Sequence, residues 1–203
     1  MAMISPTMRS EMNALICGFE PFGGRSINNA WEVAQQLEGM RNVDVIKIPV
    51  SFEKSHQVII ERLNHKRYDL VLIMGETGFT TDYVRLERVA INYKDSLGAD
   101  NDGVTADDAE LIVDAPKAYF TELPVKRMAQ FLKDRGHKVK VTNSTGTFVC
   151  NSVYYHILHY LKENDIPTKA LFVHLPATTE VVSLEEMTET LKALIEKLNW
   201  ILN

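Results

Sequence analysis

Short apolar runs alternate along the chain with longer amphipathic segments. The runs are rich in Val, Ile and Leu and do not alternate with polar residues, which is typical of strands buried on both faces of a sheet. The longer segments repeat their apolar residues every three or four positions, which predicts helices with one buried face. We expect strands at residues 14–17, 43–48, 70–74, 139–141 and 171–174, and helices at residues 31–37, 53–63, 125–135, 149–161 and 184–201.

The alternation of strands and helices predicts a layered α/β domain around a mostly parallel sheet. The chain has 203 residues without an internal repeat or a linker, so we expect a single domain at residues 14–203. Residues 1–13 read as a flexible lead-in. Residues 75–116 interrupt the alternation with turn-forming residues, and within them we expect one strand, at residues 87–92.

The composition argues against several classes of function. Hydrophobic residues make up 45% of the chain and charged residues 24%, which is ordinary for a globular protein. A net charge of −5 without a block of Lys or Arg argues against nucleic acid as a partner. The chain lacks a run of about 18 apolar residues that could cross a membrane, and residues 1–13 lack the apolar region of a signal peptide. We therefore expect a cytoplasmic protein without a membrane partner.

The predicted topology selects four segments for a binding site. In open α/β sheets, ligands bind beyond the carboxyl ends of the strands. The segments that follow predicted strands are residues 18–24, 75–78, 143–147 and 174–176. His174 belongs to the last of them, and Cys150 comes shortly after the third, so these two reactive side chains are the first candidates.

Cys150 stands near the start of a predicted helix. If Thr147 caps that helix, the helix dipole and the free N–H groups favour the thiolate form of Cys150, which is a nucleophile. The alternative is that Cys150 is a small buried hydrophobic residue of the helix face. Cys17 lies within a predicted strand and is expected to belong to the core. Two cysteines do not make a disulfide framework.

His174 and Glu87 each have a catalytic and a structural interpretation. His174 ends a predicted strand and could act as the base for Cys150, or it could be a core histidine bonded to a backbone carbonyl. Glu87 lies in an otherwise apolar segment, where a carboxylate needs a partner. It could orient the imidazole as the third member of a triad, or it could pair with Arg85 or Arg88.

Other patterns argue against phosphate and metal. Residues 18–24 are rich in Gly but lack the Lys-Ser/Thr of a P-loop. His156 and His159 share a helix face, but the sequence brings no third zinc ligand near them. We therefore expect neither a phosphate cradle at residues 18–24 nor a zinc site at His156 and His159. Phe19 and Phe22 flank a proline in the Gly-rich segment, where they either cover the core or line a pocket.

Four segments together resemble the pyroglutamyl peptidase I family, also called the pyrrolidone-carboxylate peptidases. The N-terminal signature of the family is similar to GFEPFGG at residues 18–24. Its catalytic segments resemble ERVAIN at residues 87–92, STGTFVCN at residues 144–151 and FVHLP at residues 172–176. The similarity runs in order from residue 14 to residue 176, and four motifs in order are far more specific than one.

The resemblance implies a cysteine peptidase that removes an N-terminal pyroglutamyl residue from peptides. It also implies a single three-layer α/β/α domain with a central mixed sheet, no metal or cofactor, a cytosolic location, and assembly into homodimers or homotetramers. By motif position, Cys150 would be the nucleophile, His174 the general base and then the acid, and Glu87 the residue that orients His174.

The resemblance also assigns the substrate end of the site. Phe19, Phe22 and Phe148 would line the pocket for the pyrrolidone ring. Glu76 stands where the family has a neutral residue, often Gln, and we count it as substrate-binding. Leu97 occupies the place of a family Arg that helps around the oxyanion, and residues 77–84 also diverge. We therefore expect reduced activity, which Leu97→Arg should raise.

Two other classes of function remain open at this point. One is a related cysteine amidase that acts on another small acyl or cyclic group, an interpretation that Glu76 and Leu97 favour. The other is a non-catalytic binding homologue on the same fold, or a different enzyme such as a nucleoside phosphorylase on a similar fold. The presence of Cys150, His174 and Glu87 argues against this second class.

Overall fold

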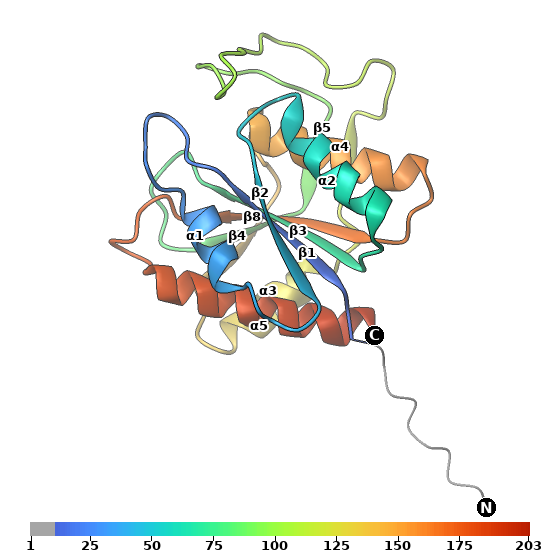
Figure 1. Ribbon diagram of the computed structural model, residues 1–203. Helices are drawn as coiled ribbons and strands as arrows, with labels where there is room; N and C mark the ends of the chain where they lie inside the picture. The colour runs from blue at the N-terminus through green and yellow to red at the C-terminus, as the bar shows by residue number, and fades with distance from the viewer. Residues whose placement is uncertain (1–10) are drawn as a thin grey trace, which may run out of the picture.

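The computed structural model describes residues 11–203, in which a six-stranded sheet lies between two layers of helices (Figure 1). The order across the sheet is β2-β1-β3-β8-β4-β7. Its strands are β1 (Ala14–Phe19), β2 (Val43–Ile48), β3 (Leu70–Glu76), β4 (Val84–Glu87), β7 (Val139–Thr142) and β8 (Lys169–Leu175). The helices are α1 (Asn29–Gln36), α2 (Lys54–His65), α3 (Val125–Lys133), α4 (Val149–Glu163) and α5 (Leu184–Leu202).

The sheet is parallel except at one junction. β1 is parallel to β2 and β3, β3 is parallel to β8, and β4 is parallel to β7. β4 runs antiparallel to β8, with Arg85 opposite His174 and Glu87 opposite Phe172. The predicted mostly parallel, mixed sheet is therefore confirmed, and the antiparallel junction places β4 beside the strand that carries His174.

The five long strands and the five helices expected from the sequence are present, with ends shifted by a few residues. The single strand expected at residues 87–92 is wrong. β4 ends at Glu87, and the chain then forms β5 (Val89–Ile91), which pairs with β6 (Ala118–Phe120) in a separate two-stranded sheet. The N–H of Arg88 still donates to the carbonyl of Thr142, but its own carbonyl accepts from Thr121. Glu87 is therefore the last residue of β4 in the main sheet.

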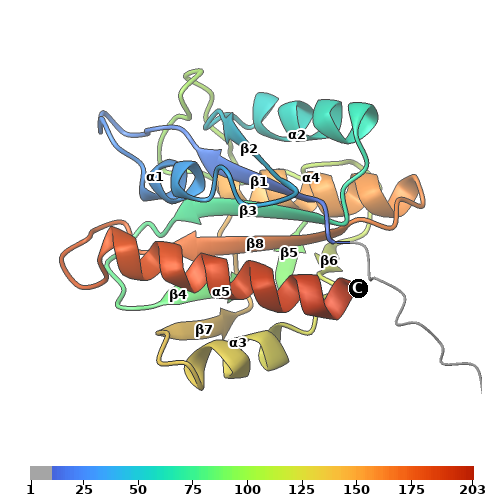
Figure 2. The ribbon, with the colours of Figure 1, turned by 60° about the horizontal axis from the view of Figure 1, so that its bottom comes forward.

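Each face of the main sheet has its own hydrophobic core. α1, α3 and α5 cover one face, and α2 and α4 cover the other (Figure 2). Alternate residues of β3 serve the two cores, because successive side chains of a strand point to opposite faces. Leu72 and Met74 belong to the core under α5, and Val71 and Ile73 belong to the core under α4. The packing on both faces fixes the carboxyl edge of the sheet.

The sequence predicts a lead-in at residues 1–13, of which residues 1–10 lie outside the described residues. Of the remainder, Met12 is buried, and its N–H donates to Oδ1 of Asn199 on α5 at 2.9 Å. The carbonyl of Asn13 accepts from the N–H of Asp69 at 2.8 Å. Contacts with the domain therefore begin before residue 14.

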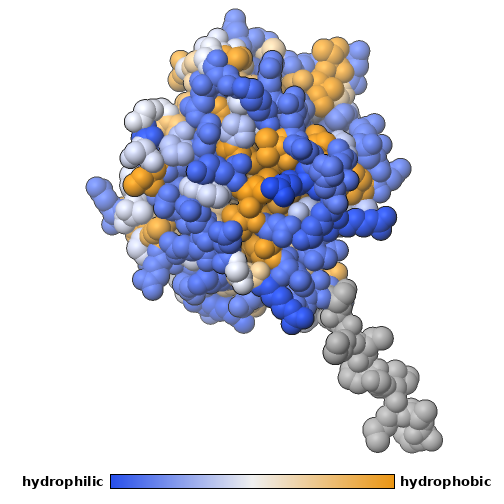
Figure 3. Space-filling view, viewed as in Figure 1, coloured by the Kyte–Doolittle hydropathy of each residue, from blue (hydrophilic) through white to orange (hydrophobic). Residues whose placement is uncertain are grey.

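The surface in the view of Figure 3 is mostly hydrophilic. Hydrophobic residues gather over the edge strand β2, whose Val43 and Val45 are only half-buried (Figure 3). Within residues 11–203, no helix combines the length and the apolar character that crossing a membrane requires.

Candidate active site

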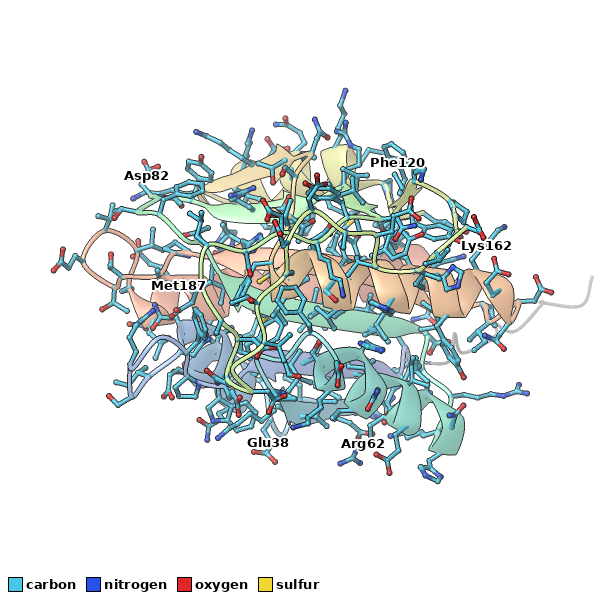
Figure 4. All side chains as sticks on the ribbon, turned by 90° about the horizontal axis from the view of Figure 1, so that it is seen from above. Glu38, Arg62, Asp82, Phe120, Lys162 and Met187 are labelled. Carbon is cyan, nitrogen blue, oxygen red and sulfur yellow. The ribbon has the colours of Figure 1, made fainter. Side chains whose placement is uncertain are left out.

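A cleft of about 730 Å³ opens beyond the carboxyl ends of β1, β3 and β8. All four segments selected from the sequence contribute to its lining, through Phe19, Glu76, Ser144 and His174 among others. The loop between β3 and β4 forms part of the wall. Seen from above, Asp82 of this loop lies at one end of the molecule, and Phe120 and Lys162 lie at the other (Figure 4). The rule that ligands bind beyond the strand ends therefore selected the end of the sheet at which this cleft lies.

Cys150 is the second residue of α4 and is half-buried in the cleft wall. The sequence suggested Thr147 as a cap of this helix, but Thr147 does not cap it. Its hydroxyl donates instead to the carbonyl of Asp95 at 2.8 Å. Phe148 takes the N-cap position without a side-chain hydrogen bond. The N–H groups of the first turn of α4 therefore have no side-chain cap from the N-cap residue.

The ionisation of Cys150 differs from the expectation as well. Burial raises the pKa of the Cys150 thiol to about 12, and the nearby Glu87 carboxylate acts in the same direction. The backbone N–H of Cys150 lowers this pKa but does not outweigh the burial. The surroundings of Cys150 therefore favour the protonated thiol over the thiolate that the helix N-terminus alone would favour.

His174 lies on β8 and is 5% exposed. Its Nδ1 atom is 2.8 Å from Oε1 of Glu87. Burial lowers the pKa of His174 below its ordinary value of 6.5, although the hydrogen bond to Glu87 opposes the change. A neutral imidazole that donates from Nδ1 to a carboxylate has an unprotonated Nε2, which can accept a proton. His174 lines the same cleft as Cys150, and the described residues show no direct hydrogen bond between the two.

Glu87 is fully buried and satisfies both alternatives raised by the sequence. Its Oε1 contacts His174, and the same oxygen lies 3.0 Å from Nη2 of Arg85. Its Oε2 accepts a hydrogen bond from the Thr142 hydroxyl at 2.6 Å. Arg85 also lines the cleft. The sequence treated Arg85 only as a rival partner, although positions 85 and 87 of one strand share a face.

Three of the expected pocket residues are aromatic, and all three line the cleft: Phe19, Phe22 and Phe148. The rings of Phe22 and Phe148 lie 5.2 Å apart between centroids, and Phe52 packs edge-on against Phe148 at 5.3 Å. Phe79 also lines the cleft, and its ring lies 5.4 Å from the guanidinium carbon of Arg85. The sequence gave no signal for Phe79, because it lies in the divergent loop.

Glu76 lines the cleft, but its carboxylate is occupied by neighbouring groups. It forms an ion pair with Arg25, and it accepts a hydrogen bond from the N–H of Asn29 at 2.6 Å. Asn29 is the first residue of α1, so the carboxylate lies at a helix N-terminus, where negative charge is favourable. Arg25 also donates to the carbonyl of Ala177 at 3.2 Å. The sequence missed Arg25, which neutralises Glu76.

The remaining candidates lie away from the cleft. Cys17 is fully buried in β1, and burial raises the pKa of its thiol. Leu97 is fully exposed and is not among the residues that line the cleft. His156 stacks on His56 with 4.0 Å between ring centroids, and His159 is hydrogen-bonded to the hydroxyl of Tyr119. Across residues 11–203, no three His, Cys, Asp or Glu side chains gather in an arrangement that could hold a metal ion.

Comparisons with family profiles and with individual proteins point to the same family. The profile of the family described as "Pyroglutamyl peptidase" matches residues 12–196. The pyrrolidone-carboxylate peptidase of Bacillus thuringiensis (strain Al Hakam) is 37% identical over 173 residues, which cover 83% of this chain and 80% of that protein. The corresponding protein of Thermococcus onnurineus (strain NA1) is 38% identical over 168 residues, which cover 81% of this chain and 84% of the relative.

Solved structures agree. The pyrrolidone carboxyl peptidase of Fervidobacterium islandicum AW-1 superposes with a TM-score of 0.86 at 32% identity, covering 94% of this chain and 99% of that one. Pyroglutamyl peptidase I of Bacillus amyloliquefaciens superposes with a TM-score of 0.88 at 28% identity, covering 94% and 98% of the two chains.

Proposed function

The chain belongs to the pyroglutamyl peptidase family, and we propose that it hydrolyses the amide bond after an N-terminal pyroglutamyl residue with Cys150, His174 and Glu87 as its catalytic triad. It is a hydrolase of the pyroglutamyl peptidase type. The observation that carries the proposed triad is the hydrogen bond of 2.8 Å between His174 and the fully buried Glu87, in a cleft that Cys150 also lines.

The reaction begins with the sulfur of Cys150. The thiol passes its proton to Nε2 of His174 while Sγ bonds to the carbonyl carbon of the pyroglutamyl residue. The C–N bond of the tetrahedral intermediate then breaks, and the leaving amine takes the proton from His174. Water attacks the thioester with His174 again as base, which releases pyroglutamate and restores the Cys150 thiol.

The ionisation of the resting groups suits this sequence. Because the pKa of Cys150 is raised and that of His174 is lowered, the thiol and the neutral imidazole exist together before substrate binds. The proton therefore moves as the sulfur attacks, and the Glu87 carboxylate stabilises the imidazolium that forms. The first N–H groups of α4, which have no side-chain cap, are the donors available to the oxyanion.

The wall of the cleft suits a neutral ring. The pyrrolidone ring of pyroglutamate is a lactam without a charged amine, so Phe19, Phe22 and Phe148 can cover its faces. Glu76 is the one carboxylate of the lining that a free N-terminal ammonium could use, and it is already paired with Arg25. A peptide that begins with a free amine therefore finds no unpaired counter-charge among the residues that line the cleft.

Amide substrates with one fluorescent leaving group and different acyl groups test this function. We expect fast release from the pyroglutamyl amide and little release from glutaminyl and glutamyl amides, which carry a free ammonium. The prolyl amide is the matched control, because it keeps the ring but replaces the lactam by a charged amine. Equal kcat/KM for the pyroglutamyl and prolyl amides would favour the related cysteine amidase of altered acyl specificity.

The proposal also covers the partners, the assembly and the location of the enzyme. Peptides with an N-terminal pyroglutamate are its proposed partners, and a cytoplasmic homodimer or homotetramer is its proposed form, as the family resemblance implies. Sedimentation of the purified protein tests the assembly, and fractionation of the source cells tests the location.

A further inference from the structure

We propose that Arg85 is a positioning residue of this active site, which holds the Glu87 carboxylate in place and supplies its counter-charge, so that His174 stays neutral in the tautomer able to take the proton of Cys150. The proposal rests on the roles proposed above for Cys150, His174 and Glu87. It assigns a role to a residue of β4 that the catalytic motifs do not include.

The Arg85 side chain is fixed by several contacts. Its Nη2 lies 3.0 Å from Oε1 of Glu87 and donates to the carbonyl of Ser144 at 2.7 Å. Its Nε donates to the hydroxyl of Thr142 at 3.2 Å. The Thr142 hydroxyl in turn donates to Oε2 of Glu87. Arg85 and Thr142 therefore contact the two oxygens of the carboxylate separately and prevent its rotation.

Glu87 needs a counter-charge that His174 does not supply. The carboxylate is fully buried, and a buried charge without a partner is costly. Burial lowers the pKa of His174, so the imidazole is neutral near neutral pH. Arg85, whose side chain is 11% exposed, is the cation in direct contact with Glu87 within the described part of the chain. Arg85 therefore supplies the counter-charge of Glu87 while His174 carries no charge.

The ionised state of Glu87 determines the tautomer of His174. An ionised carboxylate can only accept hydrogen bonds, so Nδ1 of His174 must donate its proton to Oε1. Nε2 then has a free electron pair. A protonated Glu87 could donate to Nδ1 instead, which would place the imidazole proton on Nε2 and remove the base. Arg85 and His174 share Oε1, so the arginine acts on the oxygen that orients the base.

The position of Arg85 contrasts with that of Leu97. Leu97, which occupies the place of the family Arg, is fully exposed and does not line the cleft. Arg85 comes from β4 and lies inside the cleft, opposite His174 in the antiparallel pair. The cation that contacts Glu87 therefore comes from β4, the strand that carries Glu87 itself.

The charged groups around His174 determine how loss of Arg85 changes the pH dependence. Glu87 and Arg85 face it from β4, and the Cys150 thiol faces the cleft from α4. On β3, Glu76 is paired with Arg25. If Arg85 becomes neutral, the Glu87 carboxylate remains without its cation and favours the imidazolium form of His174. The pKa of His174 then rises, and the acidic limb of kcat/KM moves to higher pH.

We would test this with Arg85→Gln, Arg85→Lys and the control Lys140→Gln. Lys140 lies opposite Arg85 on β7 and is exposed, so its replacement removes an equal charge that solvent already screens. With a pyroglutamyl amide as substrate, Arg85→Gln should lower kcat by about tenfold to a hundredfold. The midpoint of the acidic limb of kcat/KM in this variant should move to a pH higher by about 0.5 to 1 unit. Arg85→Lys should keep the limb of the wild type, and Lys140→Gln should leave both quantities unchanged.

A second measurement does not depend on substrate. Long-range nitrogen–proton correlations in protein labelled with ¹⁵N-histidine report the tautomer and the pKa of His174, which the spectrum of His174→Gln assigns. We expect an Nδ1-protonated ring in the wild type and a raised pKa in Arg85→Gln. An unchanged His174 pKa in folded Arg85→Gln, or an equal shift in Arg85→Lys, would overturn the role of Arg85. A wild type inactive on pyroglutamyl amides would instead contradict the proposed function.

Discussion

The sulfur of Cys150 lies 3.0 Å from the point that a Cβ atom on Gly75 would occupy. Gly75 belongs to β3 and pairs in register with His174 on β8. Because Gly75 has no side chain, the thiol of Cys150 has room to lie against β3, next to β8, the strand that carries His174. The same Cβ position is 2.9 Å from Cζ of Phe172, so neither neighbour leaves room for a methyl group.

Gly75→Ala should therefore displace the thiol. We expect kcat to fall by at least about tenfold, because a small misplacement of a reacting atom is costly. Overpacking against Phe172 should also reduce the free energy of unfolding by about 1–3 kcal/mol. Steady-state kinetics and thermal unfolding measure the two effects. Gly98→Ala is the matched control, because no atom lies within 4 Å of its Cβ position. Normal kinetics in Gly75→Ala would show that the sulfur does not need this space.

The two thiols should differ sharply in reactivity. Cys150 is half-buried in the cleft that His174 also lines, whereas Cys17 is fully buried in β1. Iodoacetamide should modify Cys150 alone and abolish activity in proportion to labelling, as peptide mapping can measure. Cys17→Ala should keep a kcat close to that of the wild type. Loss of activity through modification of Cys17 would contradict the assignment of the nucleophile.

The pH profile should report His174 in its neutral form. Because the pKa of His174 is lowered from 6.5, kcat/KM should fall with decreasing pH only below that value. Ionisation of the Cys150 thiol should add no limb near neutral pH, since its pKa is about 12. Glu87→Gln removes the carboxylate that fixes the imidazole, and its kcat should drop by about 10²–10⁴. An acidic limb above pH 6.5 in the wild type would contradict this description of His174.

The expected effect of Leu97→Arg on kcat differs between the sequence and the structure. The sequence alone predicted a gain in kcat, because the family has an Arg at this place. In the structure Leu97 is fully exposed outside the cleft, while Arg85 is already inside it. We now expect Leu97→Arg to leave kcat unchanged on a pyroglutamyl amide. A clear rise in kcat would show that this loop can supply a charge to the transition state that the first N–H groups of α4 do not provide.

Local patterns predicted the fold well and the electrostatics of the site poorly. The apolar runs identified β3 from its first residue, because a strand buried in a sheet needs a continuous apolar stretch. They failed at residues 87–92, since the apolar pattern continues from β4 into β5 although the chain leaves the main sheet. Which sheet a strand joins depends on partners such as β6, which are distant in the sequence.

The charge state of the site depends on contacts between distant segments. Arg85 meets Thr142 and Ser144, and Glu76 meets Arg25, across more than fifty residues of chain in each case. The pKa of Cys150 depends on burial, which a helix position does not reveal. Residue types and spacing predicted which side chains meet in the cleft, whereas their protonation follows from packing.

The acyl-enzyme is the most direct test of the account, because it links the substrate to one sulfur atom. Wild-type protein mixed with a pyroglutamyl amide and quenched in acid should carry one added pyroglutamyl group, which peptide mass mapping should locate on Cys150. Cys150→Ala should show neither the adduct nor amide hydrolysis. An adduct on another residue, or hydrolysis by folded Cys150→Ala, would contradict the claim that this chain acts through a thioester on Cys150.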